Sequence, residues 1–129
     1  TQIVIFISAL VCLTACAANR RADLEKSVNS YVKAISRGDE RMAMAFVEPK
    51  LQSEFHKNLK VLNGLRISQA EILTIYPDLK TESAMVSVFY EYFSETESEL
   101  KAVNRFYKWS FNPEAKAWFL ADSKPLGTN

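Results

Sequence analysis

The sequence predicts an α+β domain in which three N-terminal helices pack on a curved, four-stranded antiparallel sheet, preceded by an apolar signal or anchor segment. Apolar residues recur at helical spacing as far as residue 64, and beyond it they alternate as they do in strands. The chain has 129 residues, 48% of them hydrophobic, with only three Gly and four Pro. It is therefore long and apolar enough for one folded core.

Three helices are predicted between residues 22 and 64. The first carries one apolar stripe with charges opposite, and Gly38 ends it because glycine adopts positive φ at little cost. Asp39 has the position of an N-cap for a short second helix over residues 40–47. Pro49 suits the first turn of a third helix, which continues to the end of this region. The predicted buried stripes consist of Leu24, Val28, Tyr31, Val32, Ile35, Leu51, Phe55, Leu59 and Leu62.

Four strands are predicted after residue 64, over residues 67–76, 83–95, 100–111 and 117–123. Alternation places one set of side chains on a single face of the third strand: Val103, Arg105, Tyr107, Trp109 and Phe111. Residues 112–116 form the last hairpin connection, and residues 124–129 are predicted to be a frayed tail. Because the helices cover only one face, the aromatic residues favour a sheet that curls around them as a cone.

Two segments resemble the nuclear transport factor 2-like (cystatin-like α+β cone) superfamily: YVKAISRGDERMAMAFV and the terminal hairpin YKWSFNPEAKAWFLAD. The resemblance extends over residues 23–124 and implies the cone fold, with residues 125–129 as a tail. The superfamily includes ketosteroid isomerases, dehydratases and polyketide cyclases as well as binding and scaffold domains, so the fold alone selects no function. Its members often dimerise through their sheets, which makes a homodimer an expectation.

The apolar run IVIFISALVCLTACAA, residues 3–18, carries no charge. It is shorter than the roughly 20 residues that span a bilayer upright, and its length is typical of the apolar core of a secretory signal. The chain begins at Thr1 without an initiator Met or a basic leader, so we expect the sequence as given to be truncated at its N-terminus. Cys12 lies inside the run, where it has the role of a small hydrophobic residue.

The quartet Leu13-Thr14-Ala15-Cys16 closes this run and resembles the lipobox of bacterial lipoproteins. The resemblance implies that Cys16 receives a diacylglyceryl group, that residues 1–15 are cleaved off as a signal peptide, and that acylated Cys16 anchors the mature chain. Ala17 stands where Asp retains such proteins in the inner membrane, so the resemblance implies an outer-membrane location facing the periplasm. The alternative is an uncleaved N-terminal membrane helix.

Residues 16–22 are predicted to be a short linker after the lipidated cysteine. Six extended residues reach only about 20 Å, which favours work close to the membrane surface. Arg20 and Arg21 are then placed to contact lipid phosphates.

The formal net charge is +1, and no basic run with interleaved aromatics occurs, so nothing favours a nucleic acid as partner. The sequence contains no Gly-rich phosphate loop, GxSxG, HExxH or CxxC motif, and we expect no cofactor and no metal. His56 is the only histidine, and its helical position favours a flank residue over a catalytic base.

Four residues remain as candidate contacts for a ligand or partner: Glu91, Arg105, Tyr107 and Trp109. Glu91 lies inside an aromatic strand and points either into a pocket or outward, and the outward position is favoured. Arg105 has a planar fork that suits an acidic ligand group, or it pairs across strands with Glu91. Tyr107 and Trp109 form either an aromatic ligand wall or, as the favoured reading, part of the core.

Three functions follow. The first is a membrane-tethered periplasmic lipoprotein whose domain binds an apolar or amphipathic ligand, or docks on an envelope complex, without catalysis. The second is a scaffold subunit of an envelope or secretion complex that keeps its N-terminal membrane helix. The third is an enzyme of the ketosteroid isomerase or dehydratase type, which requires an open apolar cavity with a carboxylate near a tyrosine hydroxyl.

Overall fold

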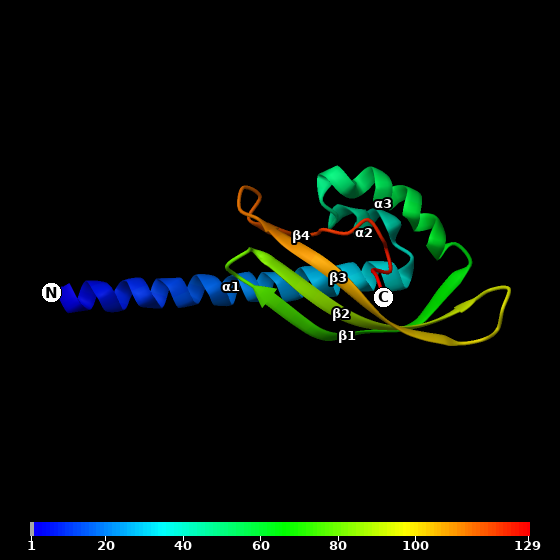
Figure 1. Ribbon diagram of the computed structural model, residues 1–129, viewed down its shortest axis with the longest axis horizontal. Helices are drawn as coiled ribbons and strands as arrows, with labels where there is room; N and C mark the ends of the chain where they lie inside the picture. The colour runs from blue at the N-terminus through cyan, green and yellow to red at the C-terminus, as the bar shows by residue number, and fades with distance from the viewer. Residues whose placement is uncertain (1) are drawn as a thin grey trace.

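The computed structural model describes the backbone of residues 2–129 and the side chains from residue 19 onward, so the predictions for Cys12 and the Cys16 thiol lie outside the described side chains. Figure 1 shows the arrangement of the elements. Their order is α1 (Gln2–Arg37), α2 (Glu40–Ala45), the 3-10 turn η1 (Pro49–Leu51), α3 (Gln52–Asn58), the 3-10 turn η2 (Leu59–Leu62), β1 (Leu65–Asp78), β2 (Ser83–Ser94), β3 (Lys101–Asn112) and β4 (Ala117–Leu120).

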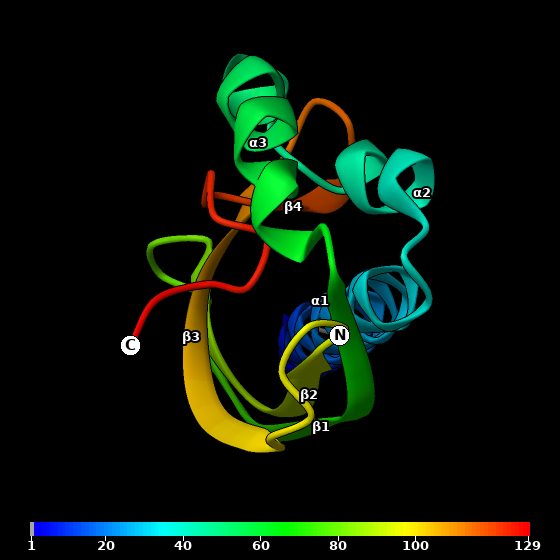
Figure 2. The same ribbon diagram turned by 90° about the vertical axis from the view of Figure 1, so that its right-hand side faces the viewer.

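The sheet is a simple antiparallel meander in the order β1-β2-β3-β4. Its register shifts twice between β1 and β2, after Ile67 and after Ile72, and such bulges increase the bend of a strand. Figure 2 shows the resulting curved sheet with the helices on its concave side. Val47 forms a parallel bridge with Leu120, so the segment after α2 continues the sheet beyond β4. These findings confirm the α+β class and the open four-stranded sheet.

One core fills the space between the helices and the concave face of the sheet. Its largest side chains, each less than 2% exposed, are Trp109, Trp118, Tyr31, Tyr90, Tyr107, Phe55, Leu24, Leu120, Val28, Val47, Val86 and Val88. The apolar stripe predicted for the first helix lies in this core. Of the residues predicted to share one face of the third strand, Tyr107 and Trp109 lie in the core, and Val103 and Phe111 pack against it. Asp39 caps α2 as predicted, because its carboxylate accepts the backbone N–H of Met42 at 3.1 Å.

Several element boundaries differ from the prediction. The helix predicted from Pro49 is divided into η1, α3 and η2, so only Gln52–Asn58 is α-helical. Strand β1 continues through Pro77 to Asp78, which is possible because β1 is an edge strand and the missing proline N–H breaks no ladder on its free side. Strand β4 ends at Leu120, three residues earlier than predicted.

Helix α1 also begins before the predicted start, and residues 16–22, which were predicted to be a short linker, are helical. Within the described residues, no helix is both long and apolar enough to cross a membrane.

The segment predicted to be a frayed tail is held against the domain. The hydroxyls of Tyr31 and Tyr107 each donate to the carbonyl oxygen of Pro125 at 2.7 Å, and Thr128 pairs with Phe106 through two backbone hydrogen bonds. Leu126 is only 7% exposed. Tyrosine donors on two other elements therefore fix this segment, and its own composition gives no sign of them.

Candidate functional site

Three buried tyrosines from three elements meet beside the chain segment that follows β4. Tyr31 comes from α1, Tyr90 from β2 and Tyr107 from β3. The hydroxyls of Tyr90 and Tyr107 are 2.8 Å apart, and those of Tyr31 and Tyr107 both reach the carbonyl oxygen of Pro125. The tyrosine cluster, as we name these three residues, joins the first helix, the sheet and the chain after β4 through one set of hydrogen bonds.

Burial raises the pKa of Tyr31 and Tyr107 well above that of an ordinary tyrosine. Burial also raises the pKa of Tyr90, and its hydrogen bond with Tyr107 and the positive charge of Arg105 offset part of this increase. The three phenols therefore stay protonated at neutral pH, so they act as hydrogen-bond donors and not as bases.

Aromatic side chains occupy the interior below this cluster. The ring of Tyr31 meets the rings of Tyr107 and Trp109 edge-on, with centroids 5.5 and 5.7 Å away, and Phe55 lies at 6.4 Å. Tyr107 is 1% exposed and Trp109 is fully buried, so the structure places both in the core. The indole N–H of Trp109 has no hydrogen-bond partner among the described residues.

A pocket of about 300 Å³ opens beside the tyrosine cluster, and we call it the mouth pocket. Arg105 from β3 lines it together with α3, η2 and the segment after β4. The full lining is Asn58, Val61, Arg105, Lys124, Pro125, Leu126 and Gly127. The pocket therefore combines two cationic side chains with an apolar wall.

Arg105 is partly buried, and its Nε is sealed from solvent without a hydrogen-bond partner. None of the ion pairs formed by the described side chains includes Arg105. Glu91, the partner considered for it, lies opposite Ala102 in the register, whereas Arg105 lies opposite Val88. Because Val88 is in the core and Glu91 is an odd number of residues away, Glu91 is on the outer face and the sheet separates the two side chains.

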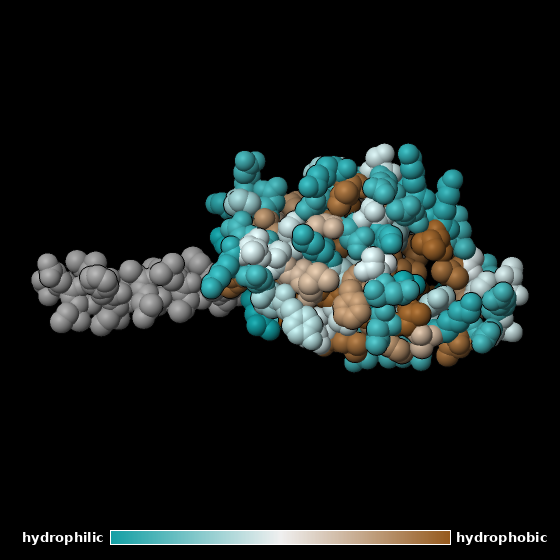
Figure 3. Space-filling view, viewed as in Figure 1, coloured by the Kyte–Doolittle hydropathy of each residue, from teal (hydrophilic) through white to brown (hydrophobic). Residues whose placement is uncertain are grey.

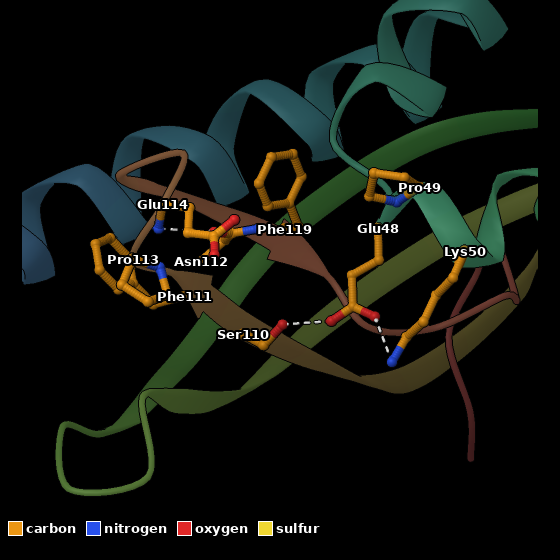
Figure 4. Close-up of a pocket in the computed structure, with 9 residues that line it drawn as sticks. All are labelled: Glu48, Pro49, Lys50, Ser110, Phe111, Asn112, Pro113, Glu114 and Phe119. Carbon is orange, nitrogen blue, oxygen red and sulfur yellow. Dashed lines mark hydrogen bonds and ion pairs between the residues drawn. The ribbon is translucent and has the colours of Figure 1, made fainter.

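A second, larger pocket of about 540 Å³ lies at the other end of β3, and Figure 4 shows its lining. The Ser110 hydroxyl donates to the carboxylate of Glu48, and the Lys50 ammonium lies 3.5 Å from the same carboxylate. Neither Glu48 nor Ser110 stands in a sequence motif that indicates this contact. Glu48 therefore already has two partners within this pocket.

Arg20, on α1, contacts the ends of the β1–β2 and β3–β4 hairpins. Its guanidinium lies 4.6 Å from the centre of the Phe111 ring and 3.4 Å from the carboxylate of Glu82. Its carbonyl oxygen accepts the indole N–H of Trp118 at 3.0 Å. Arg20 is therefore engaged by the domain itself, while Arg21 pairs only with the exposed Glu25.

Replacing Gly127 by alanine is expected to detach the segment that walls the mouth pocket. Gly127 has φ of +67°, and an added Cβ would lie 2.6 Å from the carbonyl oxygen of Phe106. The positive φ and the steric clash both disfavour alanine, and we expect a loss of about 1–3 kcal/mol in the free energy of unfolding. Urea denaturation of the full chain measures it. Alanine at Gly64, whose φ is also positive but which has open space around it, is the matched control for the clash.

No protein-family model matches the chain, and neither does any curated protein. Solved structures do match it. A ketosteroid isomerase-like protein from Erwinia carotovora atroseptica has a TM-score of 0.60 and 16% identity over 78% of this chain and 89% of its own. An NTF2-like family protein from Streptomyces avermitilis has a TM-score of 0.57 and 13% sequence identity, over 77% of this chain and 88% of its own.

A SEC-C motif containing protein from Psychrobacter arcticus gives a TM-score of 0.60 and 13% identity, over 77% of this chain. This chain spans only 58% of the length of that protein. At these identities the comparisons show the fold alone, and that fold is the NTF2-like cone.

Proposed function

We propose that the chain is a bacterial envelope lipoprotein, anchored through acylated Cys16 at the outer membrane and facing the periplasm, whose NTF2-like domain binds a ligand without catalysis. The observation that carries the anchor is the quartet Leu13-Thr14-Ala15-Cys16 at the end of an uncharged apolar run. Two or three acyl chains on one cysteine make a stable anchor, whereas one is marginal.

The position of Arg20 supports work close to the membrane. Arg20 follows Cys16 by four residues and already packs on the domain, and in a helix four residues rise only about 6 Å. A chain anchored at Cys16 would hold the β1–β2 turn, which contains Glu82, beside the lipid headgroups. A protein that docks on this domain would then be another envelope component.

The filled interior supports binding over catalysis. The isomerase and dehydratase hypothesis needs an open cavity in the cone, and the corresponding space holds Tyr31, Tyr107 and Trp109. Glu91, the carboxylate considered for that role, is on the outer face of the sheet. We take the mouth pocket as the binding surface, because its lining combines two cationic side chains with apolar residues.

Self-association through the convex face of the sheet belongs to the same proposal. Figure 3 shows this face as a mixture of apolar and polar residues. Its exposed apolar side chains include Leu73, Tyr76, Met85 and Phe106.

Mass spectrometry of the membrane-extracted protein tests the anchor. We expect a mature N-terminus at Cys16 that carries acyl chains. Changing Cys16 to serine should abolish both the processing and the added mass, whereas changing Cys12 to serine, the matched control, should leave both unchanged. An intact segment 1–15 in the wild-type protein would refute the proposal.

That last outcome would instead support the scaffold subunit with a retained N-terminal helix. One observation favours this second candidate: α1 is continuous from Gln2 to Arg37 and does not break at residue 16.

A further inference from the structure

We infer that the mouth pocket binds the carboxylate of a small amphipathic ligand, with Arg105 holding the carboxylate and the wall formed by Val61, Pro125 and Leu126 holding its apolar body. This inference rests on the proposed ligand-binding function and names the site and the ligand class. It assigns a role to Arg105 and Lys124, which take part neither in the core nor in the proposed membrane anchor.

Arg105 lacks the partner that a partly buried guanidinium normally has. Its Nε is buried without a hydrogen bond, and no carboxylate among the described side chains forms an ion pair with it. Burying part of a charge without a partner costs free energy, which an incoming anion recovers. A planar guanidinium also binds a carboxylate with two parallel hydrogen bonds, so Arg105 selects this group over a neutral one.

The rest of the lining adds to the positive potential and supplies no competing acid. Lys124 contributes the second cation, and Asn58 is occupied because its amide donates to the carbonyl oxygen of Ser123 at 2.9 Å. Asp122 is the acid next to this segment, and its carboxylate accepts the backbone N–H of Lys124 at 2.9 Å. Asp122 therefore shapes the turn that presents Lys124.

The apolar side of the pocket is fixed before any ligand arrives. The two tyrosine hydroxyls hold the carbonyl oxygen of Pro125, and the backbone pairing of Thr128 with Phe106 holds the chain on the other side of Leu126. Val61 is 54% exposed on η2 and faces this segment across the pocket. A wall that needs no ordering loses less entropy on binding. A volume of about 300 Å³ suits a short-chain carboxylic acid and not a large lipid.

The test uses the full chain in nanodiscs of phosphatidylcholine, with hexanoate, hexanol and acetate as probes. We expect hexanoate to bind saturably in the millimolar range and to shift the Nε–Hε NMR signal of Arg105. Hexanol lacks the charge and acetate lacks the apolar body, so both should bind about tenfold more weakly or worse. Hexanol binding as tightly as hexanoate, or a wild-type Arg105 signal that does not move at millimolar hexanoate, would overturn the inference.

Variants separate the two parts of the site. Arg105→Gln should weaken hexanoate binding about tenfold or more, and Lys124→Gln should weaken it severalfold. Arg41→Gln removes an exposed arginine on α2 and is the matched control with unchanged binding. If Arg105→Gln does not fold, Lys124→Gln and the shift in the wild-type signal still decide. Unchanged binding in a folded Arg105→Gln protein would refute the assignment.

The lipoprotein proposal and the mouth-pocket inference can be refuted independently of each other. A Cys16→Ser chain that has lost its acyl mass should still bind hexanoate if the pocket is assigned correctly. An acylated chain that does not bind hexanoate would keep the lipoprotein proposal and refute only this inference.

Discussion

Replacing Trp109 by alanine is expected to lower the free energy of unfolding by about 3–5 kcal/mol. Trp109 is fully buried, and its ring packs edge-on against Tyr31 of α1. Its removal therefore leaves a cavity where the first helix meets the sheet, and the surrounding rings come from rigid elements that collapse poorly into it. The total free energy of unfolding of a domain is only about 5–15 kcal/mol, so we expect the variant to be close to unfolding.

Urea denaturation of the full chain, followed by circular dichroism, measures this loss as a lower midpoint with an unchanged slope. Phe106→Ala is the matched control, because Phe106 lies on the same strand with its ring on the outer face, 40% exposed. We expect it to cost at most about 1–2 kcal/mol. Equal losses in the two variants would show that Trp109 is not a central core residue.

The domain is also expected to lose stability steeply once the pH rises above about 10, the ordinary pKa of tyrosine. The folded protein raises the pKa of Tyr31, Tyr90 and Tyr107, so all three stay protonated when folded and release protons on unfolding. Their contribution is complete below pH about 10 and is lost as the pH rises toward the folded pKa values. Three such protons correspond to a slope of about 4 kcal/mol per pH unit.

The measurement follows tyrosinate absorbance and circular dichroism through an alkaline titration. We expect these three phenols to ionise only as the fold is lost, in one cooperative step. Tyr107→Phe should reduce the slope by about one proton, and it should also destabilise the domain at neutral pH because Tyr90 and Pro125 lose a partner. Tyr76→Phe is the matched control, because it removes the same hydroxyl from a ring that is 61% exposed. Ionisation of all tyrosines before unfolding would contradict the prediction.

Local periodicity was sufficient for the parts of the fold in which one face is buried. The stripe of Leu24, Val28 and Tyr31 and the inward face of β3 are both in the core, because side-chain direction in helices and strands follows the backbone repeat. Alternation also favoured an outward Glu91, and the register places it on the outer face. Alternation applied to β2 and β3 together, with their register known, excludes an ion pair between Glu91 and Arg105.

The predictions that failed depend on contacts distant in the sequence. Nothing in residues 124–129 indicates that tyrosines on α1 and β3 hold Pro125, so a short polar segment was expected to fray. The mouth pocket was missed for the same reason, because four of its lining residues come from that segment. Arg105 was selected from its chemistry, but its lack of an acidic partner became visible only in three dimensions.

The hydrogen bonds of Tyr31 to Pro125 and of Trp118 to Arg20 join residues 94 and 98 positions apart. Helix α1 therefore cannot complete its packing until nearly the whole chain is available. The lipoprotein proposed above would have to cross the inner membrane, and a chain that crossed it unfolded would benefit from this delay. The leading segment would emerge first and remain unpacked, and the core would close only after the last strand had crossed. Export and folding would then be ordered in time by the chain itself.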